Sequence, residues 1–126
     1  MTPGITFDAG GLIALDRNDR RAVVLVARAA EAGARITVPA TALAQAIRDP
    51  GRQVRLARLI RQPTTDVIPL DRVDATNVGR LLASTEMADI TDAHVVICAR
   101  RRAQQILTSD PGDLHRLDPG LVLVVV

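Results

Sequence analysis

Short strand-like runs alternate with longer segments of helical periodicity along the whole chain. The strand-like runs are residues 5–7, 35–38, 67–68, 106–107 and 121–126. Apolar residues recur at helical spacing in residues 19–32, 41–48, 51–62, 71–83 and 89–102, and a shorter apolar segment covers 12–15. Strands that alternate with helices are typical of a parallel sheet with helices on both faces. The pattern therefore predicts an α/β fold.

Length and composition support one soluble domain over residues 1–126. The chain has 126 residues, of which 48% are hydrophobic, which excludes a disordered protein. No apolar run reaches the roughly 20 residues of a membrane span, and the start does not resemble a signal peptide. The single Cys98 cannot form an internal disulfide. We therefore expect a cytoplasmic protein.

The charged residues are unusual in kind rather than in number. The net charge is only +2, yet all sixteen basic residues are Arg. The planar guanidinium suits phosphate and carboxylate, which favours a nucleic-acid or acidic partner. A GC-rich genome, which favours Arg codons, explains the same bias. A single aromatic residue argues against a base-stacking platform for single strands.

Part of this arginine gathers on one helix face. At roughly 100° per residue, Arg52, Arg55 and Arg58 share a sector, and Arg48 precedes it. The apolar residues Val54, Ala57 and Ile60 lie roughly opposite. Leu59 falls on this basic side and Arg61 on the apolar side, so the segregation is imperfect. The sector either contacts RNA phosphates or an acidic partner, or is simply a solvated face.

Five carboxylates occupy positions from which they can converge. Asp8 and Asp110 each follow a short apolar strand, and in parallel sheets that end of the strands binds ligands. Asp89 and Asp92 open a helix, and Asp113 lies three residues after Asp110. Each acid also has a purely structural explanation, as a helix cap or a turn residue. We expect them to form one acidic pocket.

Such a cluster favours a hard cation. Carboxylates that share a site repel each other and raise each other's pKa. All-oxygen ligation suits Mg²⁺ or Mn²⁺ rather than zinc, and such ions assist phosphodiester hydrolysis by activating water and neutralising charge. Because no second acid lies two positions after Asp8, a phosphatase of another type is less favoured.

The other reactive side chains carry less weight. His94 lies two positions after Asp92 and points away from it around the helix. His115 is expected at the surface, and Cys98 among apolar neighbours in the core. No Ser-His-Asp or Cys-His arrangement can be argued from these positions.

Four short motifs in order resemble those of the PIN domain, and more narrowly of VapC-type ribonuclease toxins of bacterial toxin–antitoxin pairs. The motifs are FDAGGLIAL (7–15), VPA (38–40), DAH (92–94) and LTSDPGDL (107–114). The resemblance covers nearly the whole chain. It implies a three-layer α/β/α sandwich with a mostly parallel sheet, and a homodimer. It also implies an endoribonuclease dependent on Mg²⁺ or Mn²⁺ that cuts RNA and is blocked by a cognate VapB-type antitoxin.

The resemblance also assigns roles to residues. Asp8, Asp92 and Asp110 match the catalytic, metal-binding acids, and Asp89 and Asp113 match additional metal-binding acids of some members.

One position departs from the family pattern. The family usually carries a Glu in the helix after the second strand, where this chain has Gln45. Gln45 can hold a metal-bound water or orient an acid, but it brings no charge. Our hypothesis is that the enzyme remains active. The alternative is a PIN-like module that binds RNA or a partner protein without cutting.

Overall fold

The computed structural model describes residues 4–126 and contains a five-stranded sheet in which every neighbouring pair is parallel. The order is β3-β2-β1-β4-β5. The strands are β1 (Ile5–Phe7), β2 (Ile36–Pro39), β3 (Thr65–Ile68), β4 (Gln105–Thr108) and β5 (Leu123–Val125). The predicted parallel sheet is confirmed.

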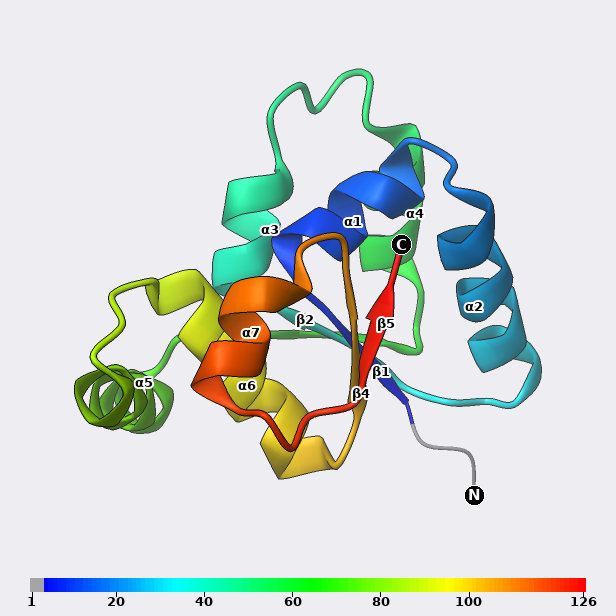
Figure 1. Ribbon diagram of the computed structural model, residues 1–126. Coiled ribbons are helices and arrows are strands. Elements are labelled where there is room, and N and C mark those ends of the chain that lie inside the picture. The colour runs from blue at the N-terminus through cyan, green and yellow to red at the C-terminus, as the bar shows by residue number, and fades with distance from the viewer. Residues whose placement is uncertain (1–3) are drawn as a thin grey trace.

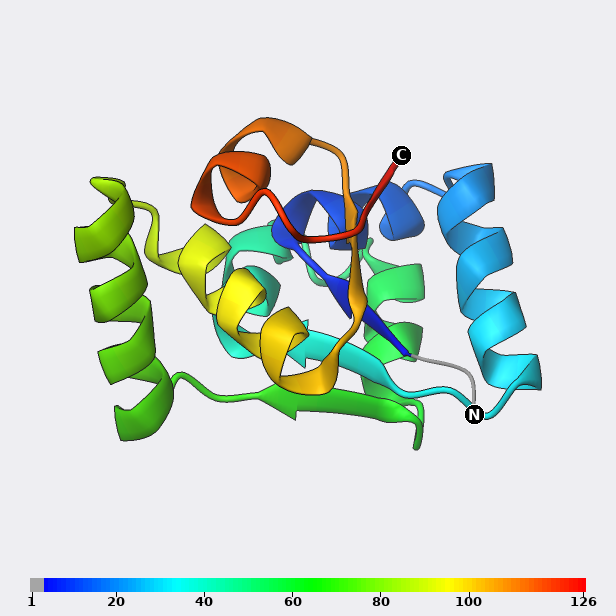
Figure 2. The same cartoon turned by 60° about the horizontal axis from the view of Figure 1, so that its bottom comes forward.

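Helices cover both faces of this sheet (Figures 1 and 2). They are α1 (Ala9–Asp16), α2 (Arg20–Glu31), α3 (Ala40–Ala46), α4 (Val54–Arg61), α5 (Arg72–Thr85), α6 (Ile90–Arg102) and α7 (Pro111–Leu117). Helix α6 packs on β1, β2 and β4, with α5 and α7 beside it. Helices α1 and α4 contact the sheet on the other side, with α2 outside α1. The α/β/α arrangement is therefore confirmed.

The core lies between the three central strands and the helices on either face. Side chains at alternate positions of a strand point to opposite faces, so a strand covered on both faces is apolar throughout. Phe7, Val38, Ile106 and Leu107 have no exposed surface. Burying each such side chain contributes roughly 1.5–3 kcal/mol. The strands that end at the acidic residues are thus rigidly held.

Helix α3 stands at the carboxyl end of the strands and contacts both α1 and α6. It ends at Ala46, not at residue 48, because Ile47 adopts an extended conformation. Helix α4 begins at Val54, later than predicted, because the turn from Asp49 to Gln53 precedes it.

Helix α7 is absent from the elements that the sequence predicts. Its seven residues, PGDLHRL, begin with Pro and Gly, which are signals for a turn. Pro is nevertheless well suited to the first position of a helix, and Leu114 and Leu117 are buried against the core.

Strand β5 is one edge of the sheet. The guanidinium Nη1 of Arg21 donates a hydrogen bond to the carbonyl oxygen of Val125 at 2.8 Å. This contact ties the start of α2 to the edge strand. Among the described residues, no helix combines the length and apolar composition that crossing a bilayer requires.

Candidate metal centre

The acidic residues meet beyond the carboxyl ends of β1 and β4. From β1 the chain adds β2 and β3 on one side of the sheet and then returns to add β4 and β5 on the other side. The strand order therefore reverses between β1 and β4. In open α/β sheets, ligands bind at this switch point. A polar hollow of about 180 Å³ lies there. Its lining consists of Asp8, Ala9, Gly10, Gln45, Asp89, Asp92, Ser109, Asp110 and Asp113.

All five acids and Gln45 that the sequence singles out are thus brought together. Their catalytic and metal-binding roles stay predictions.

Asp8 is both a helix cap and a wall of the hollow. Its Oδ1 accepts a hydrogen bond from the amide of Gly11 at 2.7 Å, which fixes the start of α1. The residue is 5% exposed. Burial raises the pKa of this carboxyl, while hydrogen bonds with Thr108 and Gly11 oppose the shift and the charge of Asp110 adds to it. The structural and functional explanations of Asp8 are therefore compatible.

The first turn of α6 contributes two acids. Asp89 is the N-cap, and its Oδ1 accepts from the amide of Asp92 at 2.9 Å, as the sequence predicts. The pKa of Asp92 is raised to about 7, first by burial and then by repulsion from Asp89, Asp8, Asp113 and Asp110. A metal-free pocket therefore holds Asp92 partly protonated at neutral pH.

The segment after β4 contributes two more acids to the hollow, Asp110 and Asp113. The amide of Asp110 donates to Thr108 Oγ1 at 3.0 Å, but the Asp110 side chain makes no capping bond. Asp113 follows in the first turn of α7, with Arg116 at 3.6 Å as an exposed partner. Surface pairs of this kind contribute little. Both carboxylates are therefore available to a ligand.

The donor set fits a hard divalent cation. The lining offers carboxylate, amide and hydroxyl oxygens, and no soft ligand. The accumulated negative charge, which adds to burial in raising the pKa of Asp92, is relieved when a cation binds.

A second group of metal-ligating types lies elsewhere, at the α5–α6 interface. The ligand atoms of Asp74, His94 and Cys98 all lie within 4.8 Å of one another. In the part of the chain that the structure describes, the carboxylates of the acidic hollow do not all lie this close together. His94 Nδ1 is hydrogen-bonded to Thr41 at 2.7 Å and its Nε2 to Asp74 at 3.1 Å. Asp74 also pairs with Arg101.

These contacts leave no lone pair of His94 for an ion. Burial raises the pKa of the Cys98 thiol to about 11, which keeps the sulfur protonated. Burial alone would raise the pKa of Asp74, but hydrogen bonds from Arg101 and His94 hold it below the ordinary value. We interpret the group as a packing network that holds α6 against α3 and α5. Sequence reasoning missed it because Asp74 lies on a different helix from His94 and Cys98.

Gln45 projects from α3 into the hollow. Ala42 and Ala46 are fully buried on the inner side of the helix, which turns position 45 outward. Thr41, one turn earlier, contacts His94. The position of Gln45 relative to Asp92 is therefore set by the contact between α3 and α6.

The four arginines of the predicted basic sector do not form a single helix face. Arg48 follows α3, where its Nη1 donates to the carbonyl of Ile47 at 2.9 Å. Arg52 lies in the turn, 3.6 Å from Asp49. Arg55 and Arg58 lie on α4, and Arg55 Nη1 donates to the Asp16 carbonyl at 3.3 Å.

The predicted sides of α4 need a correction. Leu59, assigned to the basic side, is 1% exposed, and Leu56 is 2% exposed. Val54, assigned to the opposite apolar side, is 51% exposed. The buried line of the helix runs through Leu56 and Leu59, three residues apart, because these side chains face the core.

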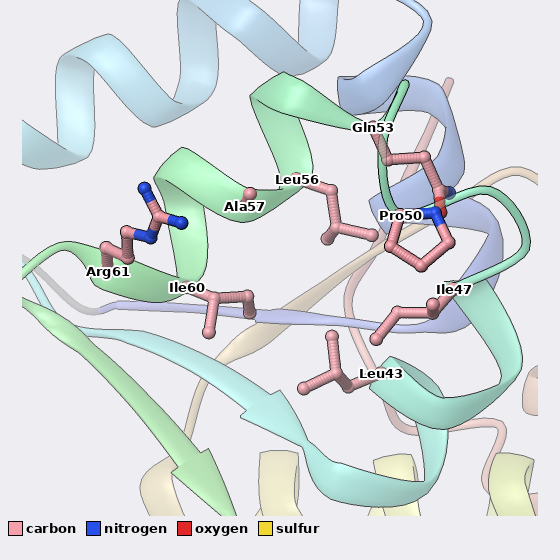
Figure 3. Close-up of a pocket in the computed structure, with 8 residues that line it drawn as sticks. All are labelled: Leu43, Ile47, Pro50, Gln53, Leu56, Ala57, Ile60 and Arg61. Carbon is pink, nitrogen blue, oxygen red and sulfur yellow. The ribbon is translucent and has the colours of Figure 1, made fainter.

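An apolar hollow of about 210 Å³ lies between α3 and α4. Figure 3 shows Leu43 of α3 and Ile47, directly after this helix, facing Leu56 and Ile60 of α4. The Arg61 guanidinium lies at one side. Ile47 remains 40% exposed. This hollow is separate from the carboxylates.

Sequence reasoning did not single out Gly10 and Ser109 as part of the acidic hollow. The available signal was their position in the chain, Gly10 two residues after Asp8 and Ser109 directly before Asp110, since the neighbours of two converging strand ends also converge.

Comparisons with known proteins agree with this architecture. No family model matches the chain, and no curated protein matches it in sequence. VapBC2 from Rickettsia felis, solved bound to a DNA fragment from its promoter, matches with a TM-score of 0.71 and 13% identity over 98% of this chain and 98% of that chain.

FitAcB from Neisseria gonorrhoeae matches with a TM-score of 0.65 and 14% identity, over 94% of this chain and 95% of that chain. FitAB bound to an IR36 DNA fragment matches with a TM-score of 0.65 and 13% identity, over 96% and 94%. At these identities the likeness shows the fold alone, and it agrees with the α/β/α sandwich expected from the sequence.

Proposed function

We propose that this chain, which shares its fold with VapBC2 and FitAB, is the endoribonuclease toxin of a VapBC-type toxin–antitoxin pair. One observation carries the proposal. Five carboxylates from three separate segments of the chain gather in one polar hollow at the switch point of the sheet. A purely structural role does not require them to meet, because each segment could be capped without the others.

Asp8, Asp92 and Asp110 would hold a Mg²⁺ or Mn²⁺ ion, with Asp89 and Asp113 in support. When bound, such an ion lowers the pKa of a water molecule and neutralises charge on a phosphate. The chain itself supplies rigid placement: Asp8 is fixed by the Gly11 amide, and Asp92 by the anchored helix α6. The Gln45 amide is placed to orient water in the same hollow.

The partner in this proposal is a VapB-type antitoxin, and the toxin acts in the cytoplasm as a homodimer. Support for a protein partner comes from the shared fold with VapBC2 and from the apolar hollow between α3 and α4. Exposed apolar surface next to Arg61 suits an apolar segment with acidic neighbours.

Incubation of the purified protein with total cellular RNA tests the activity. We expect discrete fragments with Mg²⁺ or Mn²⁺ and none with excess EDTA. Asp8→Asn should abolish cleavage, since it removes a carboxylate but keeps a cap acceptor. Asp49→Asn, which changes an exposed acid outside the hollow, should cleave like the original protein. Cleavage that persists in Asp8→Asn or in EDTA contradicts the proposal.

The second candidate is a PIN-like module that binds RNA or a partner protein without cutting. Gln45 favours it, because the hollow lacks the charge that a Glu would bring. Host-cell toxicity separates the two candidates: under the ribonuclease proposal Asp8→Asn removes toxicity, and under the binding proposal toxicity persists.

A further inference from the structure

The outer face of α1 forms a path that leads away from the acidic hollow. Gly10, Ile13, Ala14 and Arg17 recur at the spacing of one helix face and line a second hollow of about 280 Å³. The other lining residues are Asp19, Ser109 and Val126. Arg17 is the only basic side chain of this lining.

The two hollows meet. Gly10 and Ser109 line both of them. A Cβ atom at Gly10 would lie 2.1 Å from Ser109 Oγ and 3.2 Å from Ser109 Cβ. The absence of a side chain at Gly10 therefore lets Ser109 pack directly against α1, and the exposed Ser109 lies at the junction of the two hollows.

Arg17 marks the far end of this path. It is the C-cap of α1, so it lies one eight-residue helix away from Asp8, the N-cap. Eight residues of α-helix span roughly 12 Å. A strand whose phosphate lies among the carboxylates would bring a neighbouring phosphate of the same strand within reach of the guanidinium.

The Arg17 side chain is available for this contact. It is exposed, and within residues 4–126 its guanidinium takes part in no ion pair or hydrogen bond. Asp19, the acid of the same lining, uses its Oδ1 to accept from the Ala22 amide at 3.0 Å. Arg20 and Arg21 follow at the start of α2 and extend the positive charge beyond Arg17.

We propose that the second hollow, along the outer face of α1, holds the RNA strand on one side of the cleaved bond. Arg17 binds a neighbouring phosphate of the strand there. This rests on the proposed ribonuclease function. Arg17 is then a positioning residue for the substrate. Its planar fork of donors matches a phosphate, and Ile13 and Ala14 offer no polar group that would read a base. The subsite therefore recognises backbone rather than sequence.

Binding measurements that need no cleavage test the subsite. The affinity of the Asp8→Asn protein for a short fluorescent single-stranded RNA is measured by anisotropy at several salt concentrations, with and without a second change, Arg17→Gln. Removal of one phosphate contact should reduce the slope of log K against log salt by about 0.7. Affinity at low salt should fall about three- to tenfold, in line with roughly one lost contact. The matched control is Arg80→Gln, an exposed arginine of α5, which should change neither quantity.

Kinetics on the otherwise original protein supply the second readout. Arg17→Gln should raise KM several-fold on a longer RNA and leave kcat unchanged. On a dinucleotide, which has only the cleaved phosphate, the variant and the original protein should have the same KM. An equal effect on both substrates, or an effect no larger than that of Arg80→Gln, overturns the proposal.

Failure of the subsite and failure of the enzyme proposal give different results. Metal-dependent cleavage with no role for Arg17 retains the enzyme and removes the subsite. RNA binding that depends on Arg17 without cleavage by the original protein retains the subsite and removes the enzyme. A protein that binds no RNA removes both. Circular dichroism confirms that each variant is folded.

Discussion

At the scale of single residues, Gln45 is where the acidic hollow differs from what the family resemblance implies. It faces five acids yet contributes no charge. We predict that Gln45→Glu binds Mn²⁺ about tenfold more tightly, which corresponds to roughly 1.4 kcal/mol. Isothermal titration calorimetry measures this directly, with Gln62→Glu, outside the hollow, as control. If Gln45→Glu binds Mn²⁺ no more tightly than the original protein, the missing charge is not limiting.

The raised pKa of Asp92 makes the stability of the metal-free protein depend on pH. The pKa is about 7 in the fold and 3.8 ordinarily, so the unfolded chain releases this proton more readily. Stability is therefore highest at low pH within this window and falls as pH rises from about 4 to about 7. The pKa of Asp8 is also raised, which acts in the same direction.

Thermal unfolding in EDTA tests this prediction. The Tm should be higher at pH 5.5 than at pH 8, and Asp92→Asn should raise the Tm at pH 8 and flatten the dependence. Asp74, whose pKa is lowered, loses its contribution only below the ordinary pKa of 3.8 and so leaves this window unaffected. A pH dependence as steep in Asp92→Asn as in the original protein would show that other groups cause it.

The sequence predicted which acids meet but not how strongly they interact. Asp8 and Asp110 were placed together because parallel strands end at the same edge of a sheet, a rule that needs no distances. The pKa of Asp92 could not be predicted, because it depends on burial and on four other acids from three segments.

At the scale of elements, α6 is the helix on which the hollow depends. Its first turn carries Asp89 and Asp92, while His94 and Arg101 join it to the buried carboxylate of Asp74 on α5. Asp74 is 1% exposed. We predict that Asp74→Ala destabilises the protein by about 3–5 kcal/mol, because it leaves two buried or partly buried partners unmatched.

Urea unfolding measures this cost. Asp71→Ala is the matched change, since Asp71 caps the same helix at its exposed start and should cost only about 1 kcal/mol. Equal losses for the two variants would mean that the buried network contributes no more than a helix cap.

Two features of individual helices explain why the sequence did not predict α7 and misplaced the buried side of α4. Helix α7 begins with Pro-Gly and is too short to show a periodic pattern, so its two buried leucines were the only signal. The buried side of α4 was misjudged because arginines occur on both sides of Leu59, and periodicity alone could not locate the core.

At the scale of the whole molecule, two neighbouring groups of arginines differ in their surroundings. One lies at the end of α1, and the other lies at the corner formed by α3, α4 and their connection. At that corner Arg52 lies near Asp49, Arg55 donates to the Asp16 carbonyl, and an apolar hollow lies alongside. The acidic and apolar surroundings of these arginines favour a protein partner over an RNA strand.

We therefore predict that combined charge reversal, Arg52→Glu with Arg55→Glu, leaves the salt dependence of RNA binding unchanged. Anisotropy titrations over a range of salt concentrations measure the slope. A slope that becomes about 1.4 smaller, the value for two lost phosphates on a single strand, would instead assign these arginines to RNA.

The bond from Arg21 to the Val125 carbonyl affects how the molecule behaves when it is crowded. An edge strand is a template on which further strands can assemble, and Val122 and Val125 beside it are exposed at 64% and 42%. The guanidinium of Arg21 occupies the Val125 carbonyl oxygen, one of the hydrogen-bond acceptors to which an added strand would bind, and places a positive charge there. The protein thus carries its own protection against fibre-like stacking at β5, independent of any partner that covers the edge.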